Sequence, residues 1–364
     1  MKIINVTFTT RIGGLEQVFL DYNECIKSTN NQIISLVHKK SLLIPLITAP
    51  YYAVNNFSKY DIITLVKIYT IINKENPDLI ITHGNRAHYM LTQVIRHRLL
   101  IHNLLNKPLG ANKIKVDIPI IGICHDYSFA HIIRCNYIIS VSNDMRQQLI
   151  SKGYPVDQIF HIPNMIKIPA DLTYSPPQPK AIPVIGILAR LEKIKGVDIF
   201  VKALASLKQQ NVVFKAKIAG NGVEYNNIKN LIYKYNLHNE IKMIGWIDNK
   251  KDFFNSIDIL CVPSRYEPFG LVILESFLHS IPVIVSNVPG PMEIVQHGIN
   301  GLVFESENHD DLSDAIKRLI EEQELAKYLT LSAFERIKTY DMVEISSRLV
   351  KFFQNVCLIN AVNQ

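Results

Sequence analysis

The sequence predicts an α/β protein made of two Rossmann-like domains, each built on a parallel sheet. Apolar, β-branched runs alternate with segments of helical length in both halves of the 364-residue chain, and no hairpin signal separates them. The length suits two domains of ordinary size. Between the halves, Ile168–Pro183 holds five of the 17 prolines, which is typical of a stiff extended linker.

The first domain is predicted over residues 1–172. The first residues, Met1–Phe8, are too short and polar for a signal peptide and predict the first strand instead. A helix is expected from the Gly13-Gly14 turn to about Lys27. The other strands expected here are Ile33–Val37, Asp78–Thr82, Ile118–Cys124 and Tyr137–Val141, and the other helices are Ile62–Ile72 and Tyr89–Leu105.

The second domain is predicted over residues 180–341, where the same alternation begins again. The strands expected are Pro183–Leu188, Val212–Ala219, Ile241–Ile244, Ile257–Val262 and Ile281–Ser286. The helices expected are Val197–Leu207, Glu224–Tyr235, Leu271–Leu278 and Asp310–Glu322, followed by an amphipathic helix from Met342 to about Val356.

The composition is that of a globular protein, with 48% hydrophobic and 20% charged residues. The longest apolar run, Leu42–Val54, is interrupted by Pro45 and Pro50, so no membrane span is expected. The cysteines have no metal-ligand spacing, and the expected setting is a reducing cytoplasm. They are Cys25, Cys124, Cys135, Cys261 and Cys357.

The positive charge is concentrated in the first half. Residues 1–179 carry 18 Lys and Arg against 11 Asp and Glu, whereas the remainder carries 21 of each. No acidic residue lies between Asp78 and Asp117. This block is predicted to face an anionic membrane or the acceptor, and the alternative is a helix whose cations simply face solvent. Its basic residues are Arg86, Arg96, Arg98, Lys107, Lys113 and Lys115.

One segment of the second half, Pro263–Glu275, carries the strongest chemical signal. It follows a buried strand and precedes an apolar helix, with Pro268 and Gly270 in the turn between them. A helix that opens at Phe269–Leu271 aims its free N–H groups at an anion. Glu267 and Glu275 then lie near the carboxyl end of a strand, where open α/β sheets bind ligands. Taken without context, the two carboxylates are better explained as solvated surface charges, because surface carboxylates are common.

The pattern P-S-x-x-E-P-F-G-(x)4-E in this segment resembles the signature of the retaining GT-B glycosyltransferases, also called family 4 or glycosyl transferases group 1. The resemblance implies two Rossmann-like domains that face each other across a cleft. The first domain would bind the acceptor and the second a nucleotide-sugar. The last helix, about 342–364, would pack back on the first domain.

The resemblance also assigns roles to residues. Arg190 and Lys195, followed by Gly196, match the two cations that stabilise the departing diphosphate, although Ala189 replaces the usual Gly before the Arg. Glu275 would hold the ribose, and Glu267 the transferred sugar. His125, just after a strand of the first domain, matches a sugar-site His. The other residues assigned to the donor site are Gly13, Gly14, Gly220, Gly222, Trp246, Phe269, Gly270 and Leu271, and Asn164 matches the I-P-N segment that ends the first domain.

The predicted function is therefore sugar transfer with retention from a UDP- or GDP-linked donor to a glycan or lipid-linked acceptor, in polysaccharide or lipopolysaccharide synthesis. Neither a metal nor another cofactor is expected, because no Asp-x-Asp cluster is present. The enzyme would act in the cytoplasm, with peripheral contact at the inner face of the plasma membrane. Two alternatives stay open: a UDP-sugar epimerase of the same fold, and a basic nucleic-acid-binding protein. The second lacks aromatic residues within its basic block beyond Tyr89.

Overall fold

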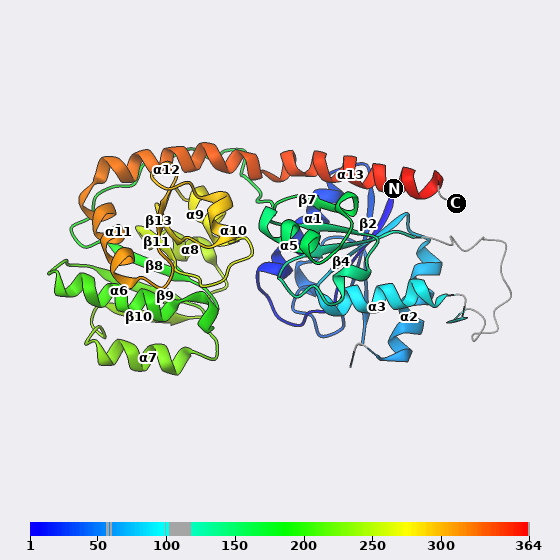
Figure 1. Cartoon of the computed structure of the whole chain (residues 1–364), viewed down its shortest axis with the longest axis horizontal. Coiled ribbons are helices and arrows are strands. Elements are labelled where there is room, and N and C mark those ends of the chain that lie inside the picture. The colour runs from blue at the N-terminus through cyan, green and yellow to red at the C-terminus, as the bar shows by residue number, and fades with distance from the viewer. Residues whose placement is uncertain (56–57, 59, 99, 102–117, 363–364) are drawn as a thin grey trace. The chain divides into compact units, whose positions relative to one another are not determined.

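The computed structural model describes residues 1–55, 58, 60–98, 100–101 and 118–362. These residues form two compact units (Figure 1). Unit 1 comprises residues 1–167 and 341–364, and unit 2 comprises residues 168–340. The chain therefore passes from unit 1 to unit 2 between Lys167 and Ile168, and returns between Tyr340 and Asp341.

Unit 1 contains a seven-stranded parallel sheet in the order β3-β2-β1-β4-β5-β6-β7. Its strands are β1 Lys2–Thr7, β2 Gln32–His38, β3 Tyr51–Val54, β4 Leu79–His83, β5 Ile120–Cys124, β6 Tyr137–Ser140 and β7 Ile159–His161. Its helices are α1 Gly14–Lys27, α2 Ile62–Glu75, α3 Asn85–Arg96, α5 Asn143–Ser151 and α13 Met342–Val362, with the 3-10 turns η1 Ile44–Leu46, η2 Ile132–Arg134 and η3 Val156–Gln158.

Unit 2 contains a six-stranded parallel sheet in the order β10-β9-β8-β11-β12-β13. Its strands are β8 Val184–Leu188, β9 Lys215–Ala219, β10 Ile241–Gly245, β11 Ile259–Val262, β12 Val283–Ser286 and β13 Leu302–Phe304. Its helices are α6 Val197–Gln209, α7 Tyr225–Lys234, α8 Lys250–Phe254, α9 Leu271–Leu278, α10 Pro289–Ile294, α11 His309–Glu321 and α12 Gln323–Ile337, with the 3-10 turns η4 Lys193–Lys195 and η5 Lys338–Tyr340. The predicted α/β fold with two parallel sheets is confirmed.

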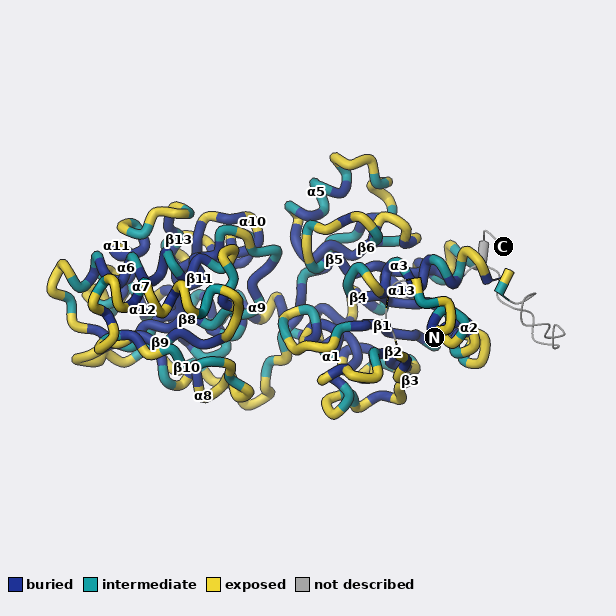
Figure 2. The backbone as a smooth tube through the Cα atoms, turned by 90° about the horizontal axis from the view of Figure 1, so that it is seen from below, coloured by how far each residue is buried: buried dark blue, intermediate teal, exposed yellow. Residues whose placement is uncertain are grey.

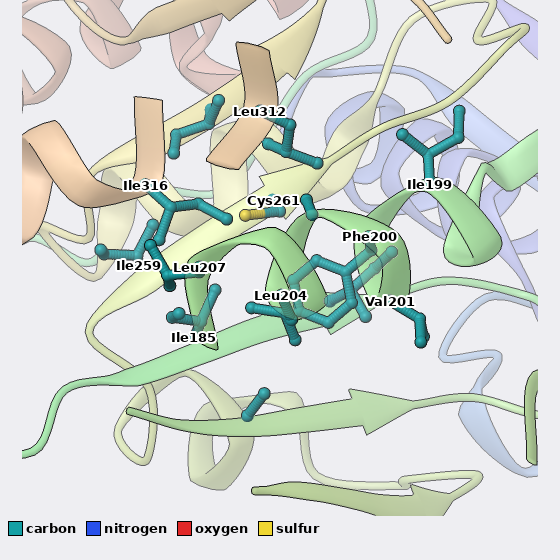
Figure 3. Packing of buried hydrophobic residues seen from close by; sticks show 14 of the residues in the cluster. Ile185, Ile199, Phe200, Val201, Leu204, Leu207, Ile259, Cys261, Leu312 and Ile316 are labelled. Carbon is teal, nitrogen blue, oxygen red and sulfur yellow. The ribbon is translucent and has the colours of Figure 1, made fainter. Parts of the chain in front are cut away.

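The strands are apolar because most of them are covered on both faces. In Figure 2 the sheets are buried along most of their length, and the exposed residues lie in loops and on the outer faces of helices. The core of unit 2 illustrates the packing (Figure 3). Phe200 and Leu204 of α6, Ile185 of β8 and Leu312 of α11 all belong to one cluster of buried side chains. The three- and four-residue spacing of the buried positions on α6 gives the helix this apolar face.

The last helix belongs to unit 1. The ring of Phe352 on α13 lies 4.3 Å from the ring of Phe160 on β7, and Arg348 donates to the carbonyl oxygen of His161 at 3.3 Å. The chain therefore closes unit 1 with its own C-terminal segment.

Some sequence predictions are wrong or incomplete. Strand β3 and helix α12 were not predicted, and α3 begins at Asn85 rather than at Tyr89. The proline-rich segment does not simply bridge the two halves. The hydroxyl of Tyr174 donates to the carbonyl oxygen of Lys327 on α12 at 3.0 Å, so the segment packs as part of unit 2.

Candidate active site

The loop after β11 turns the chain into α9 as the sequence predicts. Gly270 precedes the helix with a φ of +100°, a backbone conformation that is strained for residues other than glycine, and α9 begins at Leu271. The first N–H groups of a helix have no intrahelical acceptor, so the start of α9 offers backbone donors at the carboxyl edge of the sheet. Phe269 is buried and packs against Tyr340, which makes it a structural anchor of this turn.

Two residues predicted for the site form an ion pair. The Lys195 ammonium lies 2.7 Å from a carboxylate oxygen of Glu267, and the two side chains are only 15% and 13% exposed. The hydroxyl of Ser264 lies 3.4 Å from the same oxygen. The structure thus brings the loop after β8 and the loop after β11 together at a shielded cation–carboxylate pair.

Glycine allows these loops to approach so closely. Gly196 has a φ of +64°, and a Cβ built there would lie 1.8 Å from the carbonyl oxygen of Pro263. A Cβ on Gly220 would lie equally close to the carbonyl oxygen of Ala189. Gly222 approaches the carbonyl oxygen of Leu191 in the same way. Close backbone packing therefore accounts for Gly220 and Gly222, which the sequence assigned to donor binding, and that assignment stays a prediction.

Arg265 fixes the same two loops, and the sequence analysis did not single it out. Its guanidinium donates to both carboxylate oxygens of Asp198 on α6, at 2.7 and 2.8 Å, and to the carbonyl oxygen of Lys193 at 2.7 Å. It also pairs with Glu307, in the loop after β13. The only signal in the sequence is an Arg at a variable position of the P-S-x-x-E-P pattern, which does not reveal its partners.

Glu275 lies in the second turn of α9 and pairs with Lys250 of α8, which the sequence analysis also missed, at 2.5 Å. Burial raises the pKa of Glu275 above its ordinary value, and the charge and hydrogen bond of Lys250 oppose that rise. Lys250 therefore favours the ionised carboxylate that ribose hydroxyls require of an acceptor.

Arg190 and Trp246 are more exposed. Arg190, in the loop after β8, pairs with Glu192 at 2.6 Å, and its side chain is 55% exposed. Trp246 directly follows β10 and is 51% exposed. Both follow strands of the same parallel sheet and therefore lie at its carboxyl edge.

In unit 1, His125 follows β5 and is held by a second histidine. Its Nε2 lies 2.9 Å from Nδ1 of His83, the last residue of β4, and the two rings stack. Burial lowers the pKa of His125 to about 3, and burial followed by the charge of His125 lowers that of His83 well below its ordinary value. Both rings are therefore neutral near pH 7, and the hydrogen bond between them couples the tautomer of His125 to that of His83.

Gly13 and Gly14 form the predicted turn between β1 and α1. Gly13 caps the helix in an extended conformation, and Gly14 is its first residue. Their assignment to the donor stays a prediction.

The basic block is only partly where the sequence placed it. Arg86 and Arg96 are exposed on α3. Arg98 is buried, with 5% exposure, so its assignment to a membrane or acceptor patch is wrong. Lys107 lies outside the described residues, as do Lys113 and Lys115.

In the described parts of the chain, no three His, Cys, Asp or Glu side chains are grouped as a metal site requires. No helix in those parts is both long and apolar enough to cross a membrane.

Solved structures define the class of the fold. Anabaena HepE, crystallised with UDP and glucose, superposes with a TM-score of 0.79 at 20% identity, over 98% of this chain and 100% of that one. The lipopolysaccharide outer core galactosyltransferase WaaB superposes with a TM-score of 0.74 at 17% identity, over 99% and 100% of the two chains. The two parallel-sheet units thus have the GT-B architecture.

The sequence of unit 2 resembles a known family. Residues 175–336 match the family model for glycosyl transferases group 1.

Curated relatives match different shares of the chain. The O-antigen biosynthesis glycosyltransferase WclY of Escherichia coli is 37% identical over 131 residues, 36% of this chain and 35% of that protein. An uncharacterized glycosyltransferase of Methanocaldococcus jannaschii is 28% identical over 47% of this chain and 44% of that protein. The chain thus spans less than half the length of these two relatives. The N-acetyl-alpha-D-glucosaminyl L-malate synthase of Bacillus anthracis is 23% identical over 80% of this chain and 78% of its own length.

Proposed function

We propose that the protein is a retaining, metal-independent glycosyltransferase that moves a sugar from a UDP- or GDP-linked donor to a glycan or lipid-linked acceptor. The observation that carries this proposal is the shielded pair of Lys195 and Glu267 beside the start of α9. A cation, a carboxylate and free backbone N–H groups at one sheet edge suit a ligand that combines phosphates with hydroxyls.

Each part of this edge would have a separate task. Lys195, with Arg190 nearby on the same loop, would stabilise the charge that develops on the departing diphosphate. The backbone N–H groups of Gly270 and Leu271 would donate to phosphate or sugar oxygens. Glu275, kept ionised by Lys250, would accept hydrogen bonds from the ribose. Glu267 would accept from a hydroxyl of the transferred sugar once a phosphate replaces it as the partner of Lys195.

Retention would follow a front-face course. The bond between the anomeric carbon and the diphosphate oxygen breaks, and the acceptor oxygen bonds to that carbon on the same face. The acceptor proton passes to the departing phosphate, so a protein base is not required. The neutral His125 would donate or accept a hydrogen bond at a sugar hydroxyl rather than carry charge.

The relatives guide the choice of substrates. WclY is named for O-antigen biosynthesis, the Rhizobium meliloti relative LpsE for lipopolysaccharide core biosynthesis, and HepE was crystallised with UDP-glucose. These properties support a UDP-sugar donor and an acceptor from cell-surface polysaccharide synthesis as the first choices for assay.

A panel of UDP- and GDP-sugars tests the proposal. One donor should raise the melting temperature and be hydrolysed slowly without acceptor, and a chelator should leave the rate unchanged. The anomeric configuration of the released or transferred sugar, read by NMR, should match that of the donor. If no donor in the panel protects the protein against melting or is turned over, the proposal is wrong. C2 epimerisation of a UDP-sugar would favour the epimerase instead.

A further inference from the structure

An exposed apolar surface lies at the carboxyl edge of the unit 1 sheet. It is formed by the start of α2, the first turn of α3 and η2, and we call it the α2–η2 surface. Ile62 and Ile63, the first two residues of α2, are 74% and 70% exposed. Ile133 on η2 is 48% exposed. Single exposed apolar residues are ordinary on a protein surface. Two adjacent, mostly exposed isoleucines at one helix end are different, because packing in the core does not account for them.

Aromatic rings connect the parts of the α2–η2 surface. The ring of Tyr89 on α3 lies 5.5 Å from the ring of Tyr60, which precedes α2, and 5.1 Å from the ring of His131. The Arg134 guanidinium lies over the Tyr89 ring, 5.4 Å from its centre. The three elements therefore present one continuous surface.

The surface is also positively charged. Lys67, one turn after Ile63 on α2, is exposed, as are Arg86 on α3 and Arg134 on η2. None of the three forms an ion pair with another described residue. The acidic side chain within the surface, Asp61, is engaged as the N-cap of α2, where it accepts from the backbone N–H and the hydroxyl of Thr64. Unpaired cations around apolar and tyrosine side chains are complementary to an anionic partner with an apolar interior.

We propose that the α2–η2 surface docks the protein on an anionic lipid bilayer. Isoleucine side chains would enter the boundary between head groups and acyl chains, tyrosine rings would lie at the head groups, and the three cations would face the anionic lipids. A glycan is a poorer occupant, because Ile62 and Ile63 offer its hydroxyls no hydrogen-bond partner.

The α2–η2 surface lies close to the histidine pair of the candidate site. Helix α3 begins directly after His83 and Gly84, and η2 follows His125 by a few residues, so the surface shares a sheet edge with the histidine pair. In one respect this inference rests on the proposed function: a bilayer at this edge would present a lipid-linked acceptor, rather than a soluble one, near His125.

Vesicle flotation tests the docking. The full chain should float with phosphatidylglycerol–phosphatidylcholine vesicles at low salt, and much less with phosphatidylcholine alone. The double substitution Ile62→Ser and Ile63→Ser should lower binding at least about tenfold, since two apolar side chains no longer enter the bilayer. The matched control is Ile182→Ser with Val223→Ser in unit 2, where two side chains 48% and 84% exposed are changed, and binding should be unaffected.

A second double variant, Arg86→Gln with Arg134→Gln, should weaken binding to anionic vesicles and reduce its dependence on salt. Absence of flotation, or equal loss in the unit 2 control, would overturn the inference. So would self-association that the isoleucine substitutions abolish, because the surface would then bind a second copy. Nucleotide-sugar protection measured on the same samples separates the two proposals: protection without flotation overturns the docking alone, and flotation without protection overturns the proposed function.

Discussion

The two sheet edges that carry the predicted site residues are built in different ways. In unit 2 the edge is held by ion pairs between different elements, Lys195 with Glu267, Lys250 with Glu275 and Arg265 with Asp198. In unit 1 the edge is held by neutral, stacked histidines, and the surface beside them is apolar and basic. Ion pairs suit a ligand with a fixed pattern of phosphates and hydroxyls. The neutral histidines of unit 1 impose no such fixed pattern of charge on the second ligand.

The unit with the charged edge is also the one that the family model matches. The family model covers residues 175–336, inside unit 2, and the O-antigen relative matches over about a third of the chain. A shared donor chemistry would preserve the charged edge, whereas acceptors differ from one glycosyltransferase to another. The following predictions test whether the two edges divide the work in this way.

The largest expected effect is on turnover when Lys195 is changed. Lys195→Ala should lower kcat by about 10²–10³-fold, because one fixed donor to the developing diphosphate charge is lost. Arg190→Ala should have a smaller effect in the same direction, since this side chain is more exposed. The matched control is Lys193→Ala, two residues away, where an exposed side chain is removed and the carbonyl contact with Arg265 remains. Equal rates for Lys195→Ala and Lys193→Ala would take Lys195 out of the chemistry.

The next effect concerns how the charged edge is held. Arg265→Met should lower kcat by about 10- to 100-fold, because the loop that carries Lys195 is no longer tied to the loop of Glu267. It should also cost about 2 kcal/mol of the free energy of unfolding, less than a fully buried pair, since Arg265 and Asp198 are 19% and 29% exposed. Arg265→Lys keeps the positive charge but loses the two-pronged guanidinium contact. Its kcat and stability should therefore lie between those of the wild-type chain and Arg265→Met. If Arg265→Met loses stability but retains full kcat, Arg265 supports the fold and not the site.

Glu275 tests the ribose assignment. Glu275→Gln should weaken UDP binding by about 1.5–3 kcal/mol, the contribution of hydrogen bonds to a charged group. Lys250→Gln should leave UDP binding near its normal strength above neutral pH. Because the pKa of Glu275 then rises further, the loss of UDP affinity on acidification should begin at a higher pH. Lys251→Gln, one residue away and exposed, is the control and should leave the profile unchanged. Calorimetry across a pH series gives these values, and an unaltered UDP affinity in folded Glu275→Gln would refute the assignment.

Acid should destabilise unit 1, because its buried histidines are neutral. His83, His88 and His125 are enclosed as neutral rings, and burial lowers the pKa of His88, like that of His125, to about 3. Below an ordinary histidine pKa of about 6.5 the unfolded chain binds protons that the folded unit does not, so stability falls as the pH drops from there toward 3. The loss is on the order of 1 kcal/mol per pH unit for each ring.

Unit 2 carries one half-buried ring with a lowered pKa, His279, where burial is the main cause and Lys251 adds to it. Hydrogen exchange followed by mass spectrometry between pH 7 and 4.5 should therefore show unit 1 opening before unit 2. His88→Gln should reduce the difference between the units, provided that it folds. Simultaneous opening of both units in the wild-type chain would contradict this account.

The sequence predicts the repeating βαβ pattern well, because fully covered strands are apolar runs and the helices between them have one buried face. It does less well where that contrast is weak. Helix α12 buries the small residues Ala326, Thr330 and Ala333 beside Leu329 and Ile337 and exposes Tyr328 and Leu331, so the apolar contrast between its two faces is weak. Strand β3 lies at the edge of its sheet, follows Pro50 and exposes Tyr51, which hides the signal of a strand.

The candidate site was predictable only in part for a related reason. The turn at Gly270 and the helix start at Leu271 are local features, and local sequence is enough to predict them. The contacts of Arg265 with Asp198 and of Lys250 with Glu275 join residues on different elements, and only the fold decides such pairs. Arg98 shows the converse: a cation within a basic run is expected to be exposed, yet Arg98, two residues after the end of α3, is buried.

The most direct test of the central claim is the affinity for UDP of the wild-type chain, Lys195→Ala and Glu267→Gln, measured by calorimetry. The claim is that a diphosphate replaces Glu267 as the partner of Lys195. Lys195→Ala should then weaken UDP binding, whereas Glu267→Gln should strengthen it several-fold, because the competing carboxylate is gone, and should still abolish most of the transfer. Weaker UDP binding in both variants, or an unchanged affinity in both, would contradict the account.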